Sequence, residues 1–141
     1  MPRPTVVFDT NVLVAELAFP EEPPACVSLA ESGRVEVAVS PALVREFAAV
    51  LRYDHLPISA LDPERRAEAI ERVVGVARVV EPAVRVRAAR DADDDAVLEC
   101  AVASAADVIV SDDFHLRNLD GIAGVRVLTR EAFLDCHADH S

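Results

Sequence analysis

The chain has 141 residues, of which 52% are hydrophobic and 28% are charged, with only 4 glycines. These proportions exclude collagen-like, coiled-coil and disordered chains, and they favour one domain over residues 1–141 that buries a core. The formal net charge of −11 argues against general affinity for nucleic acids, because phosphate binding normally relies on a basic surface.

The sequence favours a cytoplasmic protein with no membrane partner. No apolar run reaches the roughly 18 residues that a bilayer span needs. Asp9 interrupts the first apolar run, so we expect no signal peptide. The three cysteines have no CxxC spacing, and we interpret Cys26, Cys100 and Cys136 as reduced thiols.

Strands and helices alternate in the first half of the chain. A buried strand is predicted at Thr5–Phe8, where apolar and β-branched residues precede Asp9. The other elements predicted here are helices over 12–19 and 25–32, a strand over 35–39, and helices over 41–52 and 63–77. Ser40 and Asp62 each precede a proline, which is typical of a helix start.

The alternation continues to the end of the chain. The predicted elements are short strands over 78–80 and 84–86, a helix over 94–105, a strand over 108–110, a helical turn over 116–119, a strand over 125–128 and a helix over 130–136. This order indicates a parallel sheet with helices on both faces. Ligands of such sheets bind beyond the carboxyl ends of the strands.

Carboxylates are concentrated between Asp91 and Asp113, where eight acids occur without an arginine. Like charges this close need a cation or raised pKa values. Asp9 and Asp113 follow predicted strands, Glu46 lies on the helix after the second strand, and Asp95 lies in the first turn of a helix. All four can approach the carboxyl edge of one sheet, where oxygen ligands suit Mg²⁺ or Mn²⁺.

Each of these acids also has a structural explanation. Asp9 is a suitable N-cap for the helix that follows it. Glu46 fits a solvent-facing helix acid paired with an arginine, and Asp113 fits a turn. The acids from Asp91 to Asp95 complement the dipole at a helix start.

Four blocks of sequence resemble the PIN-domain ribonucleases. Residues 8–14 (FDTNVLV) look like the opening motif of that family, and residues 91–101 (DADDDAVLECA) resemble its second acidic block. Residues 106–116 (ADVIVSDDFHL) and 125–134 (VRVLTREAFL) resemble its last two blocks. The blocks occur in the family's order and span nearly the whole chain, and the closest branch is the VapC-like toxins.

The resemblance implies an α/β fold, a three-layer α/β/α sandwich with a mostly parallel central sheet. It also implies a ribonuclease that uses Mg²⁺ or Mn²⁺ to hydrolyse phosphodiester bonds in RNA, leaving 5′-phosphate and 3′-hydroxyl ends. The activity would belong to the toxin of a type II toxin–antitoxin system. Its partners would be an RNA substrate, a cognate antitoxin protein and a second copy of the chain in a homodimer.

The resemblance also assigns roles to individual residues. The catalytic acids would be Asp9, Glu46, Asp95 and Asp113. Three of them, Asp9, Asp95 and Asp113, would hold the metal ion, with Asp93 as the alternative to Asp95. Asn11 and Ser111 would orient those ligands or a bound water.

Two other functions fit the same residues. One is a non-catalytic PIN-like module that docks a partner protein, and the other is a solitary housekeeping nuclease that processes RNA. Any RNA substrate must approach an acidic protein, so a local rim of arginines is needed. The arginines proposed for that rim are Arg85, Arg87, Arg90, Arg117, Arg126 and Arg130.

Overall fold

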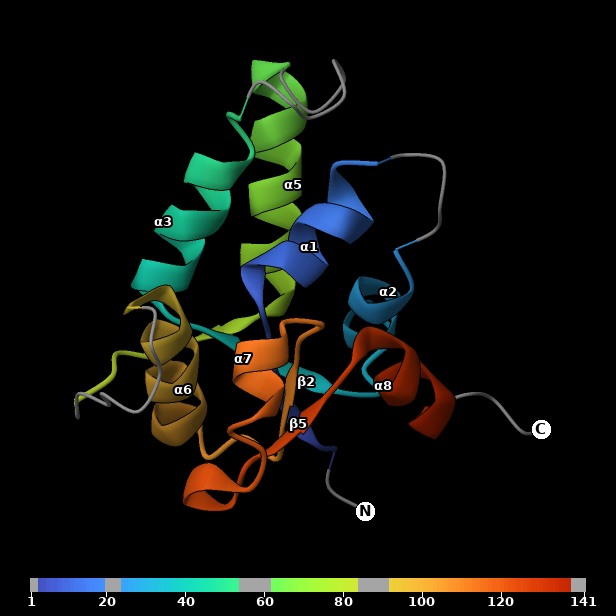
Figure 1. Cartoon of the computed structure of the whole chain (residues 1–141). Coiled ribbons are helices and arrows are strands. Elements are labelled where there is room, and N and C mark those ends of the chain that lie inside the picture. The colour runs from blue at the N-terminus through green and yellow to red at the C-terminus, as the bar shows by residue number, and fades with distance from the viewer. Residues whose placement is uncertain (1–2, 20–23, 54–61, 84–91, 138–141) are drawn as a thin grey trace.

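The computed structural model describes residues 3–19, 24–53, 62–83 and 92–137, which form a central sheet covered by helices (Figure 1). Five strands are hydrogen-bonded in the order β3-β2-β1-β4-β5, and every pair is parallel. The strands are β1 (Thr5–Phe8), β2 (Glu36–Val39), β3 (Arg78–Val79), β4 (Val108–Val110) and β5 (Arg126–Leu128). The predicted α/β fold with a mostly parallel sheet is therefore confirmed, with β1 at the centre.

Helices connect the strands and lie on both faces of the sheet. They are α1 (Thr10–Leu17), α2 (Ala25–Glu31), α3 (Pro41–Val50), α5 (Pro63–Val76), α6 (Ala92–Ser104), α7 (Phe114–Arg117), the 3₁₀ helix η1 (Ile122–Gly124) and α8 (Arg130–Cys136). Within the described ranges, none of these helices has the length and apolar character needed to cross a membrane.

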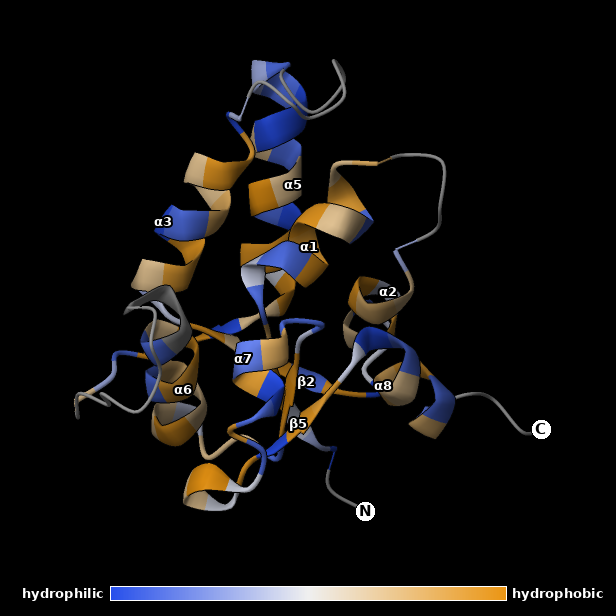
Figure 2. Ribbon diagram, in the orientation of Figure 1, coloured by the Kyte–Doolittle hydropathy of each residue, from blue (hydrophilic) through white to orange (hydrophobic). Residues whose placement is uncertain are grey.

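The alternating side chains of the strands divide the interior into two cores. Val6 and Phe8 of β1 pack into one core with α1, α2, α5 and α8, whereas Val7 packs into the other with α6 and α7. Helix α3 contributes to both, with Phe47 in the first core and Leu43 in the second. Figure 2 shows hydrophobic strands between helices whose faces alternate in hydropathy. The result is the three-layer sandwich that the sequence predicts.

Three helices, α1, α6 and α7, begin two residues earlier than the sequence indicates. Helix α1 begins at Thr10 because the carbonyl oxygen of Asp9 accepts the first helical hydrogen bonds. Helix α7 begins at Phe114 because the side chain of Asp113 caps it. The predicted strand over 84–86 lies outside the described residues.

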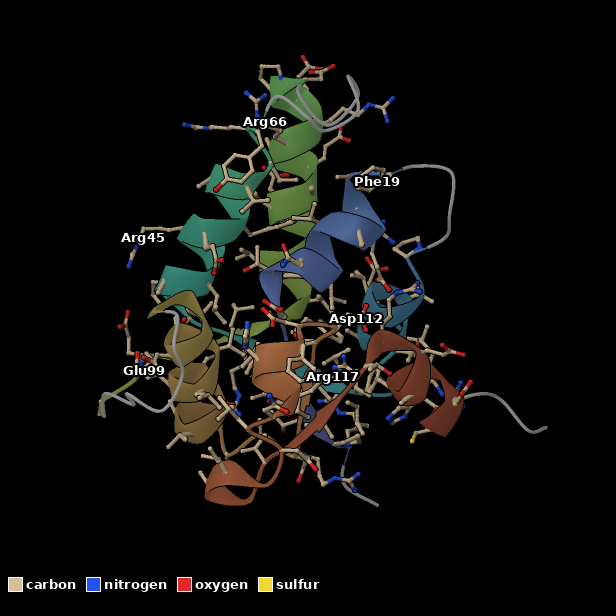
Figure 3. All side chains as sticks on the ribbon, viewed as in Figure 1. Phe19, Arg45, Arg66, Glu99, Asp112 and Arg117 are labelled. Atoms are coloured by element: carbon tan, nitrogen blue, oxygen red, sulfur yellow. The ribbon has the colours of Figure 1, made fainter. Side chains whose placement is uncertain are left out.

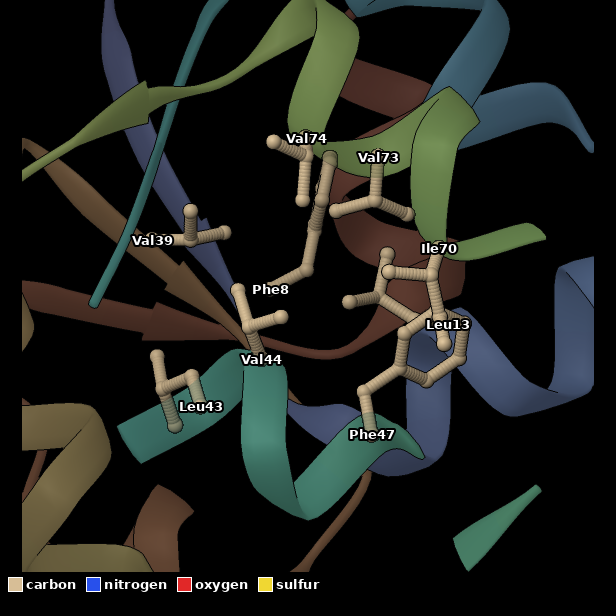
Figure 4. Close-up of a pocket in the computed structure, with 9 residues that line it drawn as sticks. All are labelled: Phe8, Leu13, Val39, Leu43, Val44, Phe47, Ile70, Val73 and Val74. Carbon is tan, nitrogen blue, oxygen red and sulfur yellow. The ribbon is translucent and has the colours of Figure 1, made fainter. Parts of the chain in front are cut away.

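A small apolar pocket lies between α3, α5, α1 and the sheet (Figure 4). Its lining residues are Phe8, Leu13, Val39, Leu43, Val44, Phe47, Ile70, Val73 and Val74. All nine are hydrophobic, so the pocket is a gap in the packing of the core and offers no group for acid–base or metal chemistry.

The three cysteines form no disulfide. Cys26 and Cys100 are buried, one in each core, and Cys136 is exposed. Burial raises the pKa of Cys100 to about 12, and burial with the neighbouring Glu16 carboxylate raises the pKa of Cys26. Both buried thiols are therefore packing groups and not nucleophiles at neutral pH.

Candidate active site

Parallel pairing of β1 with β4 places Asp9 beside Ser111. Phe8 pairs with Val110 at the ends of these strands, and the backbone N–H of Asp9 donates to the carbonyl oxygen of Val110 at 3.0 Å. The next residue of each strand therefore leaves the carboxyl edge of the sheet at the same place. Both side chains are buried, with 6% of Asp9 and 0% of Ser111 exposed.

The hydroxyl of Ser111 joins two of the predicted acids. It donates a hydrogen bond to Oδ2 of Asp9 at 2.8 Å, and its oxygen accepts one from the backbone N–H of Asp113 at 3.0 Å. Oδ1 of Asp113 accepts from the backbone N–H of His115 at 2.8 Å. The orientation of Asp9 and the backbone position of Asp113 thus depend on one buried hydroxyl.

Asp9 is a buried carboxylate with a raised pKa. Burial is the largest cause, and the charge of Asp113 raises the pKa further. The Ser111 hydrogen bond and the N–H groups of Thr10 and Asn11 lower it, but less strongly. Although Asp9 occupies the N-cap position of α1, its side chain makes no capping hydrogen bond within the described residues. The amides at the start of α1 lower the pKa of Asp9 less than burial raises it, so they do not offset the cost of burying this carboxylate.

These groups fit a hard divalent cation. The carboxylates of Asp9 and Asp113 interact electrostatically, and the charge of Asp113 raises the cost of ionising Asp9. A divalent cation between them would stabilise the charged forms of both. Carboxylate oxygens are the ligands that Mg²⁺ and Mn²⁺ prefer in proteins.

Glu46 is linked to the same edge through Thr10. The Thr10 hydroxyl donates to Oε2 of Glu46 at 3.1 Å, and Thr10 is only 2% exposed. Since Thr10 directly follows Asp9, the contact ties α3 to the end of β1. The sequence interpretation gave Thr10 no role. A polar, β-branched residue in the first turn of a helix could have indicated a hydroxyl that bonds a neighbouring element.

The remaining predicted residues are less closely grouped. Helix α6 packs against β1 and begins beside the start of α3, and Asp95 in its first turn is half-buried (Figure 1). Asn11 is exposed, and the side chain of Asp93 lies outside the described residues. Among the side chains that the structure describes, no three carboxylate, imidazole or thiol groups lie together closely enough to hold an ion. The structure thus groups Asp9 with Asp113 and does not add Asp95 to them.

The sequence model of the PIN domain matches residues 5–115. The chain belongs to the PIN domain family. The matched region contains all four predicted acids, and it ends just after the loop that carries the last of them. A comparison with curated proteins gives no match.

The fold of this PIN domain is shared with a solved structure. A chain of VapBC2 from Rickettsia felis, bound to a DNA fragment from their promoter, superposes with a TM-score of 0.58 at 11% sequence identity. The similarity covers 89% of this chain and 98% of that chain. At this identity the similarity establishes the fold alone.

A buried ion pair, which the sequence interpretation missed, links α1 to α2 and α8 of the PIN domain. Glu16 of α1 accepts hydrogen bonds from the backbone N–H groups of Cys26 at 2.8 Å and Val27 at 2.9 Å, at the start of α2. Its Oε2 also accepts from Nε of Arg130 at 2.9 Å. The backbone N–H of Arg130 in turn donates to Oδ1 of Asp112 at 3.0 Å, which fixes the loop between Ser111 and Asp113.

The predicted basic rim is only partly available. Arg130 uses its guanidinium to pair with buried Glu16, so it is not an open surface charge. Nε of Arg126 lies 3.6 Å from Oδ1 of Asp120, and both side chains are well exposed. Arg117 lies on α7 beside the candidate site (Figure 3). The other three arginines of the rim, at positions 85, 87 and 90, lie outside the described residues.

Proposed function

We propose that this PIN domain is a metal-dependent ribonuclease that hydrolyses phosphodiester bonds in RNA. The observation that supports the proposal is the buried carboxylate of Asp9, which lies at the carboxyl end of the central strand and is joined through Ser111 to Asp113. Burial of a charge without a neutralising cation is costly, and binding of a metal ion would explain why a carboxylate is buried at this edge.

Asp9, Asp95 and Asp113 would hold Mg²⁺ or Mn²⁺, and Glu46 would complete the set of catalytic acids. When bound, such an ion supplies a Lewis acid that activates water and offsets charge on the phosphate. The chain's own residues prepare the site for this. Ser111 holds one oxygen of Asp9, and Thr10 holds one oxygen of Glu46.

Hydrolysis would add the oxygen of water to phosphorus and break the bond to the 3′ oxygen, leaving 5′-phosphate and 3′-hydroxyl ends. Glu46, whose Oε2 accepts from Thr10, is suited to take a proton from water because it is only half-buried. No covalent enzyme intermediate is needed, and both buried thiols are excluded as nucleophiles by their raised pKa values.

We further propose that residues 1–141 form one domain that acts as the toxin of a type II toxin–antitoxin system in the cytoplasm. The shared fold with a chain of the VapBC2 structure supports this assignment. A cognate antitoxin would cover the carboxyl edge of the sheet, and the toxin would form a homodimer. A small antitoxin-like reading frame immediately upstream would favour this role over that of a solitary housekeeping nuclease.

The decisive experiment compares the wild type with Asp9→Asn and Asp107→Asn on single-stranded and structured RNA. Asp107 is the matched control, because its Oδ2 accepts from the backbone N–H of Thr5 at the opposite, amino edge of the same strands. We expect Mn²⁺- or Mg²⁺-dependent cleavage by the wild type and Asp107→Asn, and a loss of at least about 100-fold for Asp9→Asn.

A second readout does not depend on cleavage. Mn²⁺ should raise the melting temperature of the wild type and of Asp107→Asn, but not that of Asp9→Asn. Cleavage that survives a chelator, or equal cleavage by Asp9→Asn, would contradict the proposed mechanism. RNA or protein binding without any cleavage would favour the non-catalytic binding module.

A further inference from the structure

Phe114 is the most exposed large apolar side chain in the described part of the chain, with 62% of its surface accessible. An exposed aromatic ring offers a large apolar face on which a ligand can stack. It occupies the first position of α7, directly after Asp113. Phe114 therefore directly follows an acid of the candidate active site.

Helix α7 holds this ring in a fixed place. Leu116 is fully buried and anchors the helix in the second core, while Asp113 caps its start. The guanidinium carbon of Arg117 lies 6.0 Å from the centroid of the Phe114 ring, at the limit of a cation–π contact. The ring of His115 lies 6.0 Å from the same centroid with an interplanar angle of 69°. A short anchored helix thus presents an aromatic face next to a cation.

The net charge of the chain makes an exposed aromatic ring useful for binding RNA. With a net charge of −11, the protein repels phosphates at long range, so electrostatic attraction alone gives RNA little affinity. Stacking of a base on an aromatic ring does not depend on net charge, and every base has a π face. Bases in a duplex are already stacked, so only unpaired nucleotides offer this contact.

We propose that Phe114 is a stacking platform for an unpaired base of single-stranded RNA, and that Arg117 contacts the adjoining phosphate. The inference rests on the proposed function and names the substrate class of the same site. Because Phe114 follows Asp113 directly, the stacked base would belong to a nucleotide beside the bond to be cut. The platform would therefore select unpaired RNA and position it against the carboxylates.

The chain contains no tryptophan, which allows a direct test. Phe114→Trp places the only tryptophan of the chain at the proposed platform, where it can be excited selectively, and Phe19→Trp is the matched control. Phe19 is also an exposed phenylalanine, at 38%, and it lies well away from α7 (Figure 3). The probe is a single-stranded RNA of about ten nucleotides, added with Ca²⁺ in place of Mg²⁺ and, separately, with a chelator.

We expect this RNA to quench the fluorescence of Phe114→Trp, and the same sequence as a blunt duplex to quench it far less. Phe19→Trp should not respond to either. Removing the ring in Phe114→Ala or Phe114→Leu should weaken binding of the single strand by about 5- to 150-fold. Arg117→Gln should lower the slope of log affinity against log salt by about 0.7, the value for one phosphate contact on a single strand.

Failure of this proposal and failure of the proposed function give different results. If the wild type cleaves RNA but Phe114→Trp is not quenched and Phe114→Leu binds normally, the platform is refuted and the nuclease stands. If RNA quenches Phe114→Trp but no variant cleaves under any metal condition, the platform stands and the nuclease is refuted. Equal quenching by duplex and single strand would overturn the preference for unpaired bases.

Discussion

Replacing Glu16 should destabilise the protein far more than replacing an acid in an exposed ion pair. The Glu16 carboxylate is only 1% exposed and accepts three hydrogen bonds, two from α2 amides and one from Arg130. In Glu16→Gln, the side chain loses its charge and one oxygen becomes an NH₂ group, so Arg130 loses its counter-ion and at least one α2 amide loses its acceptor.

The expected cost follows from burial. Breaking a buried ion pair by removing one partner costs about 3–5 kcal/mol, and the 27% exposure of the Arg130 side chain favours the lower end. For a chain of 141 residues, the unfolding entropy near the melting temperature is about 0.3 kcal/mol per kelvin. A loss of about 3 kcal/mol therefore lowers the melting temperature by about 10 °C.

Thermal and urea unfolding of Glu16→Gln and Glu31→Gln would test this. Glu31 is the matched control because it forms two short hydrogen bonds with Arg72, at 2.7 and 2.8 Å, while its side chain is 37% exposed. The control should lose less than about 1 kcal/mol, or about 3 °C. Equal losses for the two variants, or a loss below about 1 kcal/mol for Glu16→Gln, would refute the argument that burial decides the value of the pair.

Three further results are expected. Ser111→Ala should cost about 1–3 kcal/mol in urea unfolding, because one buried hydroxyl makes two hydrogen bonds, and it should also reduce RNA cleavage. The pKa of Asp9 is raised in the folded state, so its contribution to stability is present below pH 4 and lost as the pH rises through that pKa. With a chelator present, Asp9→Asn should therefore be more stable than the wild type at pH 7, by about 1.4 kcal/mol for each unit by which the pKa is raised. The difference should vanish near pH 3, and a difference that is constant with pH would contradict the raised pKa. A thiol reagent at pH 8 should modify only Cys136 in the folded protein, because Cys26 and Cys100 are buried, and all three cysteines after unfolding. Rapid labelling of Cys26 or Cys100 in the folded protein would contradict this packing.

Much of the fold was predictable because its signals are local. The run at Thr5–Phe8 and the prolines after Ser40 and Asp62 predict elements that the structure contains within about two residues. Alternation of strands and helices was enough to predict a parallel sheet. The placement of Asp9 and Asp113 at strand ends followed from the same patterns.

Contacts between distant residues were not predictable in this way. Ser111 and Asp9 are 102 positions apart, and Arg130 and Glu16 are 114 apart. Their meeting depends on strand order, register and rotamers, none of which has a local sequence signal. Glu16 in particular is an acid on a short helix, a pattern that also fits a solvent-exposed face.

The sequence by itself thus determined the order of strands and helices, the two-sided sheet and the strand ends where carboxylates accumulate, because hydrophobic period and capping act over a few residues. Only the tertiary structure decided which polar groups are buried together and that Phe114 is left in water. Burial and exposure are set by the packing of segments far apart in the chain, and the local sequence does not contain that information.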